Sequence, residues 1–168
     1  YQCPHCRDMH PIIKGLLDSD AFPNDILIVE RYRPLTTIFQ YSVPIARAAE
    51  AAGLQGKFHE YGDRLFDNRD TLSAAADTTA LTTMLEDFAT SLGLNLTQFR
   101  ADVADPDVAA RVDRDLNEAI AMGINSTPTF FLNGTQLVNT NVATETDFRA
   151  AVQAELNDVT SPVQVNRT

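Results

Sequence analysis

The chain has 168 residues, of which 44% are hydrophobic and 21% are charged, which is the composition of a folded globular domain and not of a disordered or low-complexity segment. Thirteen Lys and Arg against 23 Asp and Glu give a net charge of -10, which argues against a nucleic-acid-binding protein because such proteins carry a basic face. No apolar run approaches 18 residues, so the sequence predicts no membrane span. The length predicts one domain, or one domain with an insertion.

The first predicted element is a helix that follows Cys6. Its apolar residues recur at helical spacing, at Met9, Ile12, Ile13, Leu16 and Leu17. Pro11 falls inside this helix and should kink it, because proline lacks an N–H donor and crowds the preceding turn. Residues 18–25 are polar and predict a loop, and the apolar run that begins at Ile26 predicts a mostly buried strand that ends at or before Pro34.

The pattern of residues 44–114 is strongly helical. Separate helices are expected over residues 46–52, 55–66, 79–92 and 95–99. Gly53 is the expected C-cap of the first of them, and Asn95 is the expected N-cap of the last. Asp105 and Pro106 predict the start of one more helix, which should reach Met122.

The hydrophobic period changes after Gly123. Residues 129–132 and 135–138 predict two short strands, and Asn133-Gly134 between them is a strong signature of a tight hairpin. Thr144 and Asp147 resemble a capping box, which predicts a final amphipathic helix to about residue 156. Strands at both ends of a helical block favour an α/β domain with a small mixed sheet.

The chemistry of the chain is concentrated in its two cysteines, Cys3 and Cys6, which form a Cys-x-x-Cys motif. One interpretation is half of a metal site, with His10 as a third ligand, but structural zinc needs four ligands and no second cluster is present. An inert disulfide is a weaker interpretation, since closing so short a loop stabilises a fold little.

A redox centre fits the motif better. At the start of a helix, Cys3 lies near backbone N–H groups that have no partner, and these stabilise a thiolate more than a thiol. The pKa of Cys3 should therefore fall below the ordinary value of about 8.5. Pro4 suits the first helical turn, and His5 can add a partial positive charge or a hydrogen bond beside the sulfur. Cys6 lies one turn further along, on the same face, and is expected to be the more buried, resolving cysteine.

The sequence Cys3-Pro4-His5-Cys6 resembles the active site of DsbA-type thiol:disulfide oxidoreductases. Residues 31–35 and 46–66 are similar to further segments of that family, and residues 123–134 closely match its Thr-Pro loop and hairpin. The resemblance covers Tyr1 to about Leu156. It implies a thioredoxin-like α/β fold with an inserted helical domain. The thioredoxin-like domain is expected at residues 1–35 and 123–157, the helical insertion at 42–122, and a tail at 158–168.

The resemblance also assigns roles to individual residues. Cys3 and Cys6 are the expected catalytic pair, supported by Pro4 and His5. Thr127-Pro128 is expected to form a cis peptide that faces the cysteines and offers backbone groups to an extended substrate chain. No cofactor or metal is expected.

One departure from the family concerns the segment before Cys3. In the thioredoxin fold a strand leads into the Cys-x-x-Cys loop, whereas only Tyr1 and Gln2 precede Cys3 here. We therefore expect the first strand of the fold to be missing from this chain.

The function implied by the resemblance is exchange of a Cys3–Cys6 disulfide with protein thiols through a mixed disulfide at Cys3, with the chain acting as an oxidant. The alternatives are an isomerase or reductase on the same fold, which Thr127 before the proline also allows, and a metal- or protein-binding module without catalysis. The expected partners are protein thiol or disulfide substrates and a membrane or soluble redox partner that resets the pair. The family implies a location outside the cytoplasm, in a periplasm or at a cell surface.

Overall fold

The computed structural model describes residues 1–17, 26–138 and 144–160. The described helices are α1 (Pro4–Leu17), α2 (Ser42–Leu54), α3 (Phe58–Asp67), α4 (Arg69–Ser73), α5 (Thr78–Ser91), α6 (Leu96–Ala104), α7 (Pro106–Ala121) and α8 (Glu145–Thr160). Strands β1 (Phe130–Leu132) and β2 (Thr135–Leu137) form a two-stranded antiparallel sheet. The predicted loop at residues 18–25 and the end of the predicted tail, residues 161–168, lie outside the described residues.

The chain divides into two compact units. The first comprises Tyr1–Asp8 and Glu30–Thr127, and the second comprises Met9–Val29 and Pro128–Thr168. Helix α1 passes from the first unit into the second and continues through Pro11. The predicted helical insertion at residues 42–122 falls inside the first unit, and its boundaries as a separate domain stay a prediction.

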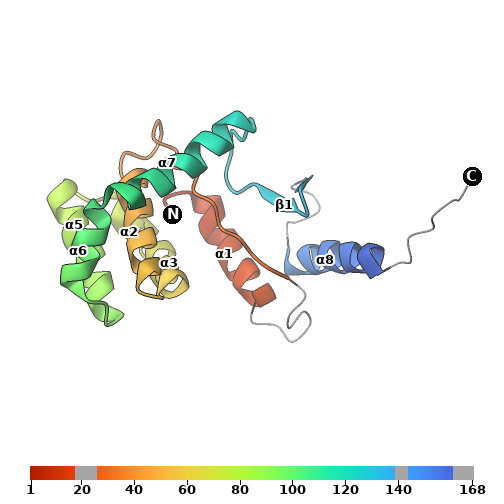
Figure 1. The fold of residues 1–168 in the computed structure, drawn as a ribbon, viewed down its shortest axis with the longest axis horizontal. Coiled ribbons are helices and arrows are strands. Elements are labelled where there is room, and N and C mark those ends of the chain that lie inside the picture. Colours follow the sequence, from red (N-terminus) through yellow and green to blue (C-terminus); the bar gives the residue numbers. More distant parts are fainter. Residues whose placement is uncertain (18–25, 139–143, 161–168) are drawn as a thin grey trace, which may run out of the picture. The chain divides into compact units, whose positions relative to one another are not determined.

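The core of the first unit forms around α2, which packs against α3, α5, α6 and α7 (Figure 1). The buried face of α2 consists of Ile45 and five alanines, Ala46, Ala48, Ala49, Ala51 and Ala52. Small side chains allow neighbouring helices to approach closely, and larger residues from those helices fill the space between them. Tyr61 of α3 is fully buried, and its hydroxyl donates to the backbone oxygen of Leu85 over 2.8 Å.

Several local predictions are confirmed in this unit. Asn95 caps α6 through a bond from the Gln98 N–H, and Asp105 caps α7 with Pro106 at its first position. Two details differ. Helix α2 ends at Leu54, one residue after the expected cap Gly53, and α6 runs on to Ala104 because its first turn is capped and no breaker interrupts it before Asp105.

The second unit contains the end of α1, the hairpin and α8. Leu16, Phe148 and Val152 form its buried core, and Phe130 packs edge-on against Phe148 with ring centroids 4.8 Å apart. The hairpin prediction is confirmed, since Asn133 and Gly134 both have positive φ, at 46° and 85°, as the tight turn requires.

The final helix also begins as predicted. Thr144 and Asp147 exchange hydrogen bonds as a capping box, with Thr144 N–H donating to Asp147 Oδ2 over 2.9 Å. Helix α8 extends through Thr160, a few residues beyond its predicted end and into the predicted tail.

The prediction of a strand from Ile26 to Pro34 is wrong. In the described part of the chain this segment forms no β-ladder, and the sheet consists of β1 and β2 alone. Its side chains still alternate, with Ile26 and Ile28 half-buried and Leu27 and Val29 exposed. The apolar pattern specifies an extended chain, but a strand also needs a hydrogen-bonded neighbour, and no described residue supplies one.

Candidate active site

The two cysteines lie at the start of α1, in the first unit. Cys3 immediately precedes the helix, Pro4 is its first residue, and the first helical hydrogen bond runs from Arg7 N–H to Cys3 O over 3.2 Å. Pro4 has no N–H to leave unsatisfied at this position. The sequence therefore places Cys3 beside the free N–H groups of the first turn and Cys6 within that turn.

The thiol of Cys3 contacts a distant part of the chain. Cys3 Sγ lies 3.3 Å from the backbone oxygen of Thr127 and donates its proton to it. Both cysteines are free thiols. The structure thus brings together three of the predicted site residues, Cys3, Cys6 and Thr127.

The two thiols differ in acidity. Burial opposes ionisation of Cys3, but hydrogen bonds from the Thr127 side chain and from Cys6 and His5 outweigh it, so the pKa of Cys3 is lowered. Burial dominates at Cys6 and raises the pKa of its thiol to about 12. At neutral pH, Cys3 is therefore the cysteine that ionises more readily.

Cys6 was predicted to be more buried than Cys3, but the exposed areas of the two residues have the reverse order. Cys3 is 8% exposed, whereas Cys6 is half-buried. The exposed area of the whole residue does not set the acidity of the thiol, because the hydrogen bonds around each sulfur act on the charge itself. Cys6 is thus the more exposed residue and yet carries the thiol that burial keeps protonated.

The side chain of Thr127 adds a second polar contact at the cysteines. The polar side chain favours ionisation of both thiols, although burial outweighs this effect at Cys6. The Thr127 hydroxyl oxygen is buried and makes no hydrogen bond to any described residue. Its proton is therefore available to a thiolate. Pro128, which follows, is half-buried, and the cis form of its peptide bond stays a prediction.

The backbone that leads to Thr127 is held by Arg33. Arg33 Nε donates to Ile124 O over 3.1 Å, and Arg33 Nη1 donates to Pro34 O over the same distance. Gly123, with φ at 70°, closes α7 just before this stretch, and Ile124 N–H donates back to Ala119 O over 2.9 Å. The start of the loop is thereby fixed to the segment that contains Arg33.

That segment is in turn fixed to α7 by a buried carboxylate. Asp115 is 1% exposed, accepts from Tyr32 N–H over 3.1 Å, and pairs with Arg31 Nε over 3.0 Å and with Arg111. Arg31 also pairs with Glu118, and the Tyr32 hydroxyl donates to Glu50 over 2.8 Å. The sequence does not reveal this network, since an acidic residue in a helix is usually solvated.

Helix α4, a five-residue helix in the first unit, was not predicted from the sequence. Arg69 Nε of this helix donates to the backbone oxygen of Gln2 over 2.6 Å, and Gln2 Nε2 donates to Ser73 Oγ over 3.2 Å. Asp70 pairs with Arg69 and also with Arg7 over 3.3 Å. No local sequence signature marks the contacts of this helix with Gln2 and Arg7, because the residues that meet are more than 60 positions apart.

The remaining predicted site residue, His5, is exposed at the start of α1. Within residues 1–17, 26–138 and 144–160, no group of three or more His, Cys, Asp or Glu is arranged to hold a metal ion. The combination of Cys3, Cys6 and His10 is therefore not assembled into such a group. In the same residues, no helix combines the length and the apolar character needed to cross a bilayer.

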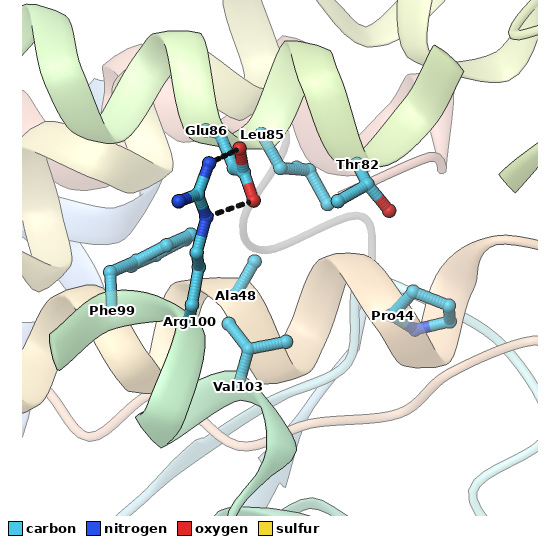
Figure 2. A pocket seen from close by; sticks show the side chains of 8 residues that line it. All are labelled: Pro44, Ala48, Thr82, Leu85, Glu86, Phe99, Arg100 and Val103. Carbon is cyan, nitrogen blue, oxygen red and sulfur yellow. Dashed lines mark hydrogen bonds and ion pairs between the residues drawn. The ribbon is translucent and has the colours of Figure 1, made fainter. Parts of the chain in front are cut away.

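A small pocket lies elsewhere in the first unit, between α2, α5 and α6 (Figure 2). Its volume is about 140 Å³, and its apolar lining includes Ala48, Leu85 and Phe99. The charged residues at the pocket pair with each other, because Arg100 donates to both carboxylate oxygens of Glu86 over 2.7 and 2.6 Å. This leaves neither of them unpaired toward a ligand.

Comparison with known proteins agrees with this geometry. A family model described as thioredoxin matches residues 1–154. A solved structure of a thioredoxin-like oxidoreductase from Silicibacter pomeroyi DSS-3 superimposes with a TM-score of 0.71 at 28% identity, covering 94% of this chain and 82% of that one. The expected fold, an α/β thioredoxin-like domain with a helical insertion, is thereby confirmed.

Curated relatives share sequence over most of the chain. The Na(+)/H(+) antiporter NhaA 1 of Salinispora arenicola is 37% identical over 134 residues, which is 80% of this chain and 19% of the relative. The protein of the same name from Mycobacterium sp. (strain KMS) is 37% identical over 138 residues, 80% of this chain and 21% of the relative. The chain thus spans about a fifth of the length of these relatives.

Proposed function

This chain belongs to the thioredoxin family, and on that premise we propose that it is a thiol:disulfide oxidoreductase that works through Cys3 and Cys6. The observation that carries the proposal is the opposite acidity of two thiols within one helical turn. The pKa of Cys3 is lowered, and that of Cys6 is raised to about 12. A pair in which Cys3 ionises readily and Cys6 stays protonated at neutral pH is suited to disulfide exchange.

The proposed direction is oxidation of substrate thiols. A substrate thiolate attacks Cys3 Sγ of the Cys3–Cys6 disulfide, the S–S bond breaks, and Cys6 leaves and takes up a proton. A second substrate thiolate then attacks the substrate sulfur of the mixed disulfide and releases Cys3 as a thiolate. The substrate loses two electrons and two protons, the cysteine pair gains the electrons and one proton, and the other proton enters the solvent.

Both acidities favour this direction. Stabilising the Cys3 thiolate stabilises the reduced pair and makes Cys3 a better leaving group in the second step. In the reverse direction Cys6 has to attack the mixed disulfide, and a thiol with a pKa of about 12 supplies little thiolate at neutral pH. An isomerase or reductase is therefore the weaker proposal on the same site.

The proposed partners follow from the chemistry. The substrates are proteins with thiols or disulfides, and a separate redox partner, membrane-bound or soluble, reoxidises the pair. We place the protein outside the cytoplasm, because a protein oxidant of thiols is effective where thiols are not held reduced. Alkylation of the native protein in intact cells tests the location, and a fully reduced pair in a cytoplasmic fraction argues against it.

The proposed function is tested by trapping the mixed disulfide. Reduced Cys6→Ser and Cys3→Ser variants are incubated at pH 7 with a peptide disulfide and analysed by mass spectrometry. Cys6→Ser should accumulate a stable adduct at Cys3, whereas Cys3→Ser should form little adduct. Equal labelling of both variants, or of neither, contradicts the assigned roles. The wild-type protein, which can expel the peptide, serves as the reference.

A further inference from the structure

Helix α4 contacts the redox motif on both of its flanks. Arg69 donates to the carbonyl of Gln2, the residue before Cys3, over 2.6 Å, and the Arg69 side chain is 18% exposed. Asp70 pairs with Arg7, the residue after Cys6, over 3.3 Å. A helix of five residues thus binds the chain immediately before and immediately after Cys3–Cys6.

The contacts differ in strength. The bond to Gln2 O is short, charge-assisted and largely shielded from water, which makes it a strong hydrogen bond. The Arg7–Asp70 pair is exposed, with side chains 40% and 72% accessible, and exposed ion pairs of this kind contribute little. Arg69 is therefore the residue of α4 that matters most to the position of the motif.

The bond to Gln2 O acts on the peptide group that joins Gln2 to Cys3. A peptide group is planar, so holding its oxygen also fixes the direction of the Cys3 N–Cα bond. Gln2 is itself 4% exposed and bonded to Ser73, and the ring of Tyr1 lies 5.0 Å from that of Phe66 on α3. The whole approach to Cys3 is thus packed against α3 and α4.

We propose that Arg69 is a positioning residue for Cys3: its hydrogen bond to the Gln2 carbonyl sets the angle at which Cys3 enters α1 and directs Sγ toward Thr127 and the N–H groups of the first turn. The inference rests on the proposed function, since it assigns a role in the same reaction. Helix α4, which lies in the predicted helical insertion, would thereby influence the reactivity of Cys3.

Loss of the Arg69 hydrogen bond should raise the pKa of Cys3. Hydrogen bonds from the backbone of Cys6 and His5 favour the Cys3 thiolate, and such bonds depend on the direction of Sγ. Without the Arg69 bond, the Gln2–Cys3 peptide group can rotate and those hydrogen bonds lengthen. The thiolate of Cys3 then becomes less favourable even where the fold is intact.

The test measures the pKa of Cys3 from the pH dependence of iodoacetamide labelling in Arg69→Met and Arg69→Lys, both in a Cys6→Ser background. At one pH unit below the pKa of the parent, Arg69→Met should label roughly tenfold more slowly, which corresponds to a pKa raised by about one unit. Arg69→Lys, which keeps the charge and a donor group but not the planar guanidinium, should lie between the two. Arg100→Met is the matched control, because it removes a guanidinium from an ion pair with Glu86 at the pocket in Figure 2 and should leave the pKa of Cys3 unchanged.

The outcomes separate this inference from the proposed function. If the parent traps a peptide disulfide at Cys3 and both Arg69 variants keep the parent's pKa, the positioning role is overturned and the oxidoreductase stands. If Arg69→Met does not fold by circular dichroism, the milder Arg69→Lys decides, and an unshifted pKa there overturns the role. If the parent traps no disulfide at all, the proposed function itself fails.

Discussion

Cys3 Sγ lies 3.3 Å from the backbone oxygen of Thr127, although 124 positions separate the two residues in the chain. The Cys-x-x-Cys motif supplies the reacting sulfur, and the loop after α7 supplies the polar groups that face it. Neither segment forms the site alone. The acidity of Cys3 therefore depends on how firmly the Thr127 loop is held.

The Thr127 hydroxyl is expected to favour ionisation of both cysteine thiols. In Thr127→Val the hydroxyl is replaced by a methyl group of similar size, so the hydrogen bond that lowers the pKa of Cys3 and Cys6 is lost. The pKa of Cys3 should rise, and the reduction potential of the pair should fall. Thr127→Ser keeps the hydroxyl and should stay close to wild type. Absorbance of the thiolate near 240 nm during a pH titration measures the effect, and equal titration curves for Val and Ser contradict the role of the hydroxyl.

The stability of the reduced protein should depend on pH in opposite ways for the two cysteines. In Cys6→Ser, the pKa of Cys3 is lower in the folded than in the unfolded state, so the folded state binds fewer protons between the two values. The free energy of unfolding should rise with pH through this window. Its contribution is lost as the pH falls through the folded pKa.

In Cys3→Ser the sign is reversed. Burial, the largest cause of the raised pKa of Cys6, is retained in this variant, so the folded pKa stays above the unfolded value of about 8.5 and the unfolded state releases its proton first. The contribution is fully present below about pH 8.5 and should be lost as the pH rises through the raised folded pKa. Urea denaturation of each reduced variant at several pH values measures both trends, with the Cys3→Ser, Cys6→Ser double variant as the baseline. Parallel profiles for the two single variants contradict the assignment.

The buried carboxylate of Asp115 is expected to be essential for stability. Asp115→Ala leaves the buried Tyr32 N–H without its acceptor, whereas Arg111 keeps Glu50 and Arg31 keeps Glu118 as a partner. An unsatisfied buried donor costs about 1–3 kcal/mol, so a loss of that size is expected. Glu86→Ala removes an exposed ion pair with Arg100 and should cost less than about 1 kcal/mol. Chemical denaturation compares the two. Similar small losses in both variants show that Asp115 does not anchor the segment that contains Tyr32.

A β-carbon at the second position of the hairpin turn should destabilise the protein through backbone strain. Gly134 has φ at 85°, and an alanine in the left-handed region costs about 1–2 kcal/mol. Gly134→Ala should therefore lower the melting temperature by several degrees. Gly15→Ala is not a suitable control, because its β-carbon would lie 3.2 Å from Glu145 Oε2. Ala150→Gly in α8 serves as the reference, since it measures the stability lost when a glycine replaces alanine inside a helix. An unchanged melting temperature in Gly134→Ala contradicts the tight turn.

The elements that the sequence predicted well are those with local causes. The Asn133-Gly134 turn, the Asp105 cap and the Thr144–Asp147 capping box each depend on residues within a few positions of one another. The strand expected at Ile26 depends on pairing with another segment, and an apolar pattern does not reveal whether a partner is present. The pattern therefore predicted the alternation of its side chains but not its hydrogen bonds.

The same reason explains which parts of the site the sequence missed. The Cys-x-x-Cys motif is contiguous and could be interpreted from residue types alone. The Arg69–Gln2 bond joins positions 67 apart, and the Asp115–Tyr32 bond joins positions 83 apart. Arginine and aspartate in helices are usually solvated, so nothing in the sequence distinguishes these from the surface charges around them.

The reduction potential of the protein decides whether Cys3 and Cys6 form a reversible and oxidising redox pair. The wild-type protein is equilibrated in glutathione buffers of graded ratio, quenched with acid, alkylated and analysed by mass spectrometry. We expect a single two-electron transition between dithiol and Cys3–Cys6 disulfide, at a potential clearly more oxidising than the value of about −270 mV for thioredoxin. A transition at or below that value, or a pair that forms no intramolecular disulfide, contradicts the oxidant role.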